Sequence, residues 1–105
     1  MPKEILLHVP PSIPPHRIVP LIDRAIIDLG LTVTLRGSLK SFPGSTHWHM
    51  KLGRQPGTLE VTWWPRHRRL WIKIQSGRTA PCINEITPKL TRELQARLDR
   101  LAHSP

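Results

Sequence analysis

The stretch TLEVTWWPRHRRLWIKI, residues 58–74, decides the fold, because it contains two strand patterns separated by one short turn. Apolar side chains occupy every second position on either side of Pro65–Arg68. Such alternation is typical of strands that bury one face. We therefore predict strands over residues 58–64 and 69–75, joined by a basic turn.

Two further strands precede this pair and extend the pattern toward the N-terminus. Residues 31–36 alternate apolar and polar side chains, with the three apolar ones predicted to lie inward, and residues 46–52 alternate again. Residues 37–45 contain a Pro-Gly pair and are predicted to be a loop, and residues 53–57 have the length of a hairpin loop. The four segments together predict an antiparallel meander.

Helical periodicity appears on both sides of the predicted sheet. Apolar residues recur every three or four positions in residues 16–29, directly ahead of Gly30, and again in residues 83–101. This spacing indicates two amphipathic helices. Either Asn84 or Thr87 is expected to cap the second helix.

The beginning of the chain has a different composition. Residues 1–15 contain five prolines, which predict an extended N-terminal arm with at most a short strand over residues 4–9. A loop is expected over residues 76–81, and residues 16–105 are expected to form a single domain. The predicted fold class is α+β, in the order helix, four-stranded antiparallel meander, helix, with both helices on one sheet face.

Basic residues concentrate in the predicted sheet. The 105-residue chain carries 16 Lys and Arg against 7 Asp and Glu, a formal net charge of +9. Between Arg36 and Arg78 there are nine basic residues and one acid, Glu60, which accounts for +8 of that total. A charge confined to one layer favours a polyanionic partner over a general effect on solubility.

The composition also argues against several other classes of protein. The longest apolar stretches fall far short of the roughly 20 residues that span a bilayer, and no secretory leader pattern is visible. Cys82 is the only cysteine, so neither an internal disulfide nor a paired-cysteine metal site can form. We expect a cytoplasmic protein without a membrane partner. No nucleotide-binding or hydrolase motif is present, so we assign no catalytic residue and no cofactor.

Strand alternation divides the four tryptophans between the two sheet faces. Trp48 and Trp63 are expected in the core, whereas Trp64 and Trp71 are expected on the face open to solvent. Aromatic rings in a positive field suit single-stranded nucleic acid, because bases stack on the rings while Lys and Arg neutralise phosphates. We therefore predict low-specificity binding of single-stranded RNA or DNA. The predicted contact residues are Arg36, His47, His49, Lys51, Trp64, Arg66, Arg68, Arg69, Trp71 and Lys73.

Other interpretations use the same residues. Trp64 and Trp71 could instead form a cross-strand pair, the seam of a homodimer or an interface with another protein. His47 and His49 share the face expected to be open to solvent, where they could act as general acid and base of a small metal-independent nuclease. A metal site is not expected, because a closed site needs about four ligands and Glu60 is the only carboxylate expected nearby.

Overall fold

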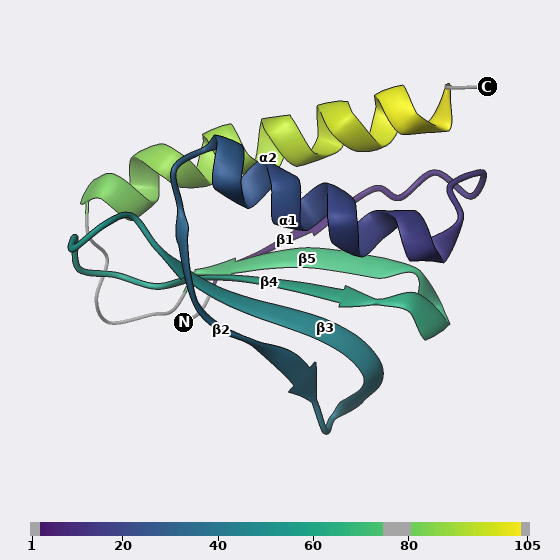
Figure 1. Cartoon of the computed structure of the whole chain (residues 1–105), viewed down its shortest axis with the longest axis horizontal. Coiled ribbons are helices and arrows are strands. Elements are labelled where there is room, and N and C mark those ends of the chain that lie inside the picture. Colours follow the sequence, from purple (N-terminus) through teal and green to yellow (C-terminus); the bar gives the residue numbers. More distant parts are fainter. Residues whose placement is uncertain (1–2, 75–80, 104–105) are drawn as a thin grey trace.

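Two helices cover one face of a five-stranded antiparallel sheet in the computed structural model, which describes residues 3–74 and 81–103 (Figure 1). The strand order is β1-β5-β4-β3-β2. The antiparallel sheet and its two helices confirm the α+β class, whereas the predicted number of four strands is wrong because the sheet has five. The loop predicted over residues 76–81 lies outside the described residues except for its last position, as do Gln75 and Arg78. The elements in chain order are β1 (Lys3–Leu7), the 3-10 turn η1 (Pro15–Arg17), α1 (Ile18–Asp28), β2 (Thr32–Leu39), β3 (Phe42–Lys51), β4 (Leu59–Trp64), the 3-10 turn η2 (Pro65–His67), β5 (Arg69–Ile74) and α2 (Pro81–Ala102).

The additional strand is β1, which belongs to the segment predicted as an N-terminal arm. It pairs antiparallel with β5 along its whole length. Beyond β1 the chain stays on the core, where Leu7, Val9 and Ile13 are buried. The side chain of Gln95 in α2 holds both backbone groups of His8, accepting from its N–H at 3.0 Å and donating to its carbonyl at 2.8 Å. Apolar residues between the prolines therefore tie this segment to the rest of the protein.

β2 and β3 are longer than predicted and continue through residues 37–45, where the sequence predicts a loop. A register shift between Gly37 and Leu39 interrupts their pairing. Opposite this shift, Pro43 and Gly44 lie in an irregular stretch of β3, which a β-bulge can accommodate without ending the strand. Pro43 and Gly44 therefore lie within a long β2–β3 hairpin, which projects away from the helices (Figure 1).

A second register shift, between Val33 and Leu35, reverses the side-chain alternation of β2. Beyond it Leu35 pairs with His49 and Arg36 pairs with Trp48. Val33 pairs with the buried Met50 ahead of the shift, so it lies on the predicted side of the sheet, although it is exposed because β2 is an edge strand. Leu35 is 54% exposed on the outer face, so the prediction that it lies inward is wrong. The extra residue of the bulge is the physical reason.

α2 begins one turn earlier than predicted. Its first residue is Pro81, whose missing N–H has no intrahelical partner to lose at that position. Neither Asn84 nor Thr87 caps the helix, because both lie inside it. Pro88 is also internal, and the Thr87 hydroxyl beside it donates to the carbonyl of Ile83 at 2.6 Å.

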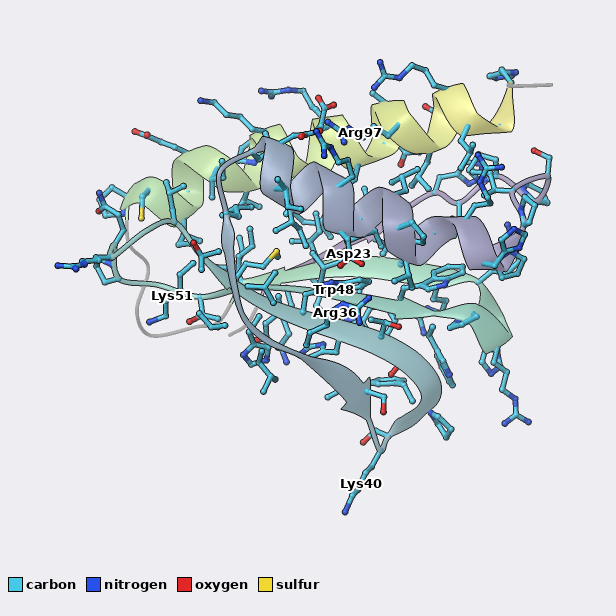
Figure 2. The ribbon with its side chains drawn as sticks, in the orientation of Figure 1. Asp23, Arg36, Lys40, Trp48, Lys51 and Arg97 are labelled. Carbon is cyan, nitrogen blue, oxygen red and sulfur yellow. The ribbon has the colours of Figure 1, made fainter. Side chains whose placement is uncertain are left out.

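The core lies between the sheet and the helices. Trp48 and Trp63 are fully buried there, as their position in the strands predicts. Arg97 joins the two helices by donating to Asp28 of α1 at 2.8 Å and to Glu93 of its own helix at 2.7 Å (Figure 2). Within the described ranges, neither helix combines the length and apolar character needed to cross a membrane.

Candidate functional site

The outer face of the sheet is the face turned away from both helices (Figure 1). It carries a pocket of about 410 Å³ that we call the outer pocket. Side chains of β3, β4 and β5 meet there because alternate residues of neighbouring strands share a face. Half of the ten predicted contact residues line it, so the structure brings these together. They are His47, His49, Arg69, Trp71 and Lys73.

Two imidazoles and one carboxylate converge in the outer pocket. His47 Nε2 lies 2.9 Å from His49 Nε2 and 3.1 Å from Glu60 Oε1. His49 Nε2 lies 3.4 Å from the same carboxylate oxygen. Glu60 of β4 is the direct cross-strand neighbour of His49, so antiparallel pairing adds the carboxylate to the two histidines of β3. We call these three residues the His-His-Glu cluster.

The His-His-Glu cluster is more buried than predicted. His47 is 5% exposed and Glu60 is 6% exposed, so His47 does not lie open to solvent. Thr62 orients the ring of His47, because its hydroxyl lies 2.6 Å from Nδ1. Burial is the main cause that lowers the pKa of His47, and the nearby His49 lowers it further while Glu60 opposes both. The His47 imidazole is therefore neutral at pH 7.

Aromatic rings cover part of the outer face. Trp64 and Trp71 lie on the predicted side of the sheet, but Trp71 is only 8% exposed, so its predicted exposure is wrong. Phe42 covers Trp71 with ring centroids 5.1 Å apart and approaches Trp64 at 4.9 Å. The Arg69 guanidinium lies 5.6 Å above the Trp71 ring. These rings form a covered cluster and not the open stacking platform that alternation alone predicts.

Arg36 lies on the helix side of the sheet and does not belong to the outer face, contrary to the prediction (Figure 2). The register shift in β2 turns its side chain toward α1. There Arg36 Nη2 donates to Asp23 Oδ2 at 2.9 Å, and its guanidinium lies 5.7 Å from the centre of the Trp48 ring. Trp48 Nε1 donates to Asp23 Oδ1 at 2.8 Å. Arg36 therefore links β2 to α1 through its ion pair with Asp23.

Arg68 has a structural role that also removes it from the predicted contact surface. Its backbone has φ 49°, a left-handed conformation that is uncommon outside glycine. Its guanidinium donates to the carbonyls of Pro10 at 2.8 Å and Ile13 at 3.1 Å. These bonds hold the segment after β1 against the turn between β4 and β5.

The remaining predicted cations keep their charges free. Within the described residues, these four cations form no ion pair with a carboxylate: Lys51, Arg66, Arg69 and Lys73. Lys40, which is not among the predicted contact residues, projects from the tip of the β2–β3 hairpin away from the helices (Figure 2). Lys40 and Phe42 are missed for one reason: the sequence predicts a loop where the structure has a hairpin.

The outer face therefore combines a buried His-His-Glu cluster, a covered group of aromatic rings and exposed cations around them. No model of a known protein family matches the chain. No curated protein and no solved structure is significantly similar to it.

Proposed function

We propose that this protein binds single-stranded nucleic acid, RNA or DNA, along the outer face of the sheet. The observation that carries the proposal is the unequal neutralisation of charge in the two layers. On the helix side, Asp23, Asp28 and Glu93 form ion pairs with four arginines, and three described cations, Arg17, Lys89 and Arg92, remain without one. Besides Arg68, which donates to backbone carbonyls, six cations of the sheet layer have no such partner among the described side chains. They are Lys40, Lys51, Arg54, Arg66, Arg69 and Lys73.

Cations without carboxylate partners are the ones that attract phosphates most strongly. A phosphate that meets Arg66 or Arg69 does not have to displace a carboxylate, and it releases a condensed counterion from the nucleic acid. Phosphate contacts carry no sequence information, so we propose low sequence specificity. Since Phe42 covers Trp71, we assign most of the affinity to phosphate contacts and a smaller part to base stacking.

The test is a fluorescence anisotropy titration of a labelled single-stranded oligonucleotide at several salt concentrations. The outer-face variant replaces Lys40, Arg66 and Arg69 with Ala. We expect weaker binding to every sequence alike. The slope of log affinity against log salt should flatten by roughly 2, because each single-strand phosphate contact contributes roughly 0.7.

The matched control removes the same charge from the helix side. It replaces Arg17, Lys89 and Arg92 with Ala, three exposed cations. We expect the salt slope of this variant to stay close to that of the parent protein. If both triple variants lower the affinity and the slope equally, binding follows net charge alone and the outer face is not the contact surface.

The two alternative functions give different results in the same experiment. A homodimer sealed through the outer face would hide Arg66 and Arg69, and light scattering would show the larger particle without nucleic acid. A metal-independent nuclease using His47 and His49 would shorten the oligonucleotide with chelator present. For the cellular location we propose the cytoplasm, in accord with the single cysteine, Cys82.

A further inference from the structure

We propose that the His-His-Glu cluster binds a divalent transition-metal ion, Zn²⁺, through His47 Nε2, His49 Nε2 and a carboxylate oxygen of Glu60. This inference does not depend on nucleic-acid binding. It rests on the positions of three potential ligand atoms, all within 4.8 Å of one another. The sequence argues against a metal because it supplies few ligands, whereas the structure shows how closely those few converge.

The distances between the three atoms match those of ligands on one metal ion. With zinc about 2.0–2.1 Å from each ligand atom, two ligands stand roughly 2.9 Å apart at a right angle and roughly 3.4 Å apart at the tetrahedral angle. The observed distances are 2.9 Å, 3.1 Å and 3.4 Å. Zn²⁺ has no geometric preference from its d electrons, so it tolerates a set of angles that spans both values.

The hydrogen-bonding capacity of the cluster also favours a cation. When His47 Nδ1 donates to Thr62, its Nε2 carries a lone pair that faces the carboxylate of Glu60. In that tautomer the Nε2 lone pair and the carboxylate are both available to a cation between them, whereas in the other tautomer Nε2 donates its proton to Glu60. A hydrogen bond such as the one between His47 Nδ1 and the Thr62 hydroxyl is a regular feature of histidines that bind metals, because it fixes the orientation of the ring.

The position of the cluster indicates a site that takes a ligand from solution. Three protein ligands leave the fourth position of a tetrahedral zinc ion to a molecule in the outer pocket. His49 is partly exposed and lines that pocket together with Arg69 and Lys73. The two cations favour an anion, so we infer that a phosphate oxygen or hydroxide completes the coordination.

The test is a titration of chelator-treated protein with Zn²⁺, followed by isothermal calorimetry and by competition with a chromophoric chelator, without nucleic acid. We expect one ion per chain. His49→Ala should weaken binding by at least roughly 10–100-fold, the loss typical of removing even an outer-shell partner. Thr62→Val keeps the shape of the side chain and removes the hydroxyl, and it should weaken binding by roughly 10–100-fold. Co²⁺ in place of Zn²⁺ should give the visible absorption band that is typical of Co²⁺ with a low coordination number, and His49→Ala should abolish this band.

The control removes two imidazoles from elsewhere on the surface: His16 and His103 are replaced with Ala, both being exposed. Its affinity for Zn²⁺ should equal that of the parent protein. Because His47 and Glu60 are buried, folding of each variant is checked by circular dichroism, and Glu60→Gln provides a substitution of nearly equal size. No stoichiometric binding by the parent protein, or equal binding by folded His49→Ala, overturns the proposal and leaves hydrogen bonds as the interactions that hold the cluster together.

Discussion

Asp23 is predicted to stabilise the fold mainly through the indole of Trp48 and less through Arg36. Asp23→Ala removes the acceptor that Trp48 Nε1 reaches at 2.8 Å, and Trp48 is fully buried. A buried donor without a partner costs about 1–3 kcal/mol, whereas the half-exposed ion pair to Arg36 contributes only about 0.2–1 kcal/mol. We expect Asp23→Ala to lower the free energy of unfolding by about 2 kcal/mol in total.

Urea unfolding followed by circular dichroism measures this loss, and an unchanged m-value shows that only stability has changed. Asp23→Asn keeps an oxygen for the indole and loses the ion pair, so it should cost about 0.5 kcal/mol, as should Arg36→Ala. Arg36→Ala should also leave the salt dependence of nucleic-acid binding unaltered. If Asp23→Asn costs as much as Asp23→Ala, the indole hydrogen bond is not the source of the stability and the reasoning fails.

Three further predictions concern stability. Arg68→Ala should lower the free energy of unfolding by about 1.5–3 kcal/mol, measured by urea unfolding. The substitution removes a charged donor, so the carbonyls of Pro10 and Ile13 lose their hydrogen-bond partner. Ile13→Ala should lower the free energy of unfolding by about 2–5 kcal/mol in the same assay, because this core residue is only 2% exposed. A loss under about 0.5 kcal/mol would show that the segment after β1 is not packed on the core. With chelator present, burial keeps the pKa of His47 in the folded protein below its ordinary value of 6.5. The unfolded chain then binds a proton more readily than the folded protein, so the free energy of unfolding should fall as the pH drops below about 6.5. Urea unfolding at pH 7.5 and at pH 5.5, roughly the range over which histidine titrates, measures this loss of stability. His47→Gln should make the loss smaller, and an unchanged loss would exclude His47 as its source.

Much of the sheet follows from local alternation. The patterns around Trp48, Trp63 and Trp71 predict the correct face for each, because a strand with one buried face has a strict period of two. The same rule places His47 and His49 together on the outer face. The sequence therefore identifies the correct face for the site residues of β3, β4 and β5, but not for Arg36 of β2.

The features that the sequence does not reveal depend on contacts between distant segments. One extra residue in β2 moves Arg36 to the helix side, and no local pattern marks this bulge. Phe42 covers Trp71 only because the hairpin continues through Pro43 and Gly44. The burial of the His-His-Glu cluster likewise follows from the pairing of β3 with β4 and from the cover that the hairpin provides.

Binding of nucleic acid by the outer face is tested most directly by mapping chemical shifts. A ¹⁵N-labelled sample is titrated with an unlabelled single-stranded oligonucleotide at low salt, and the backbone amide shifts are followed to saturation. We expect the largest shifts around the outer pocket and at the hairpin tip, at residues such as Lys40, His49 and Arg69, with small shifts along α2 around Arg92. Shifts centred on the helices, or no saturable shifts, would contradict the account.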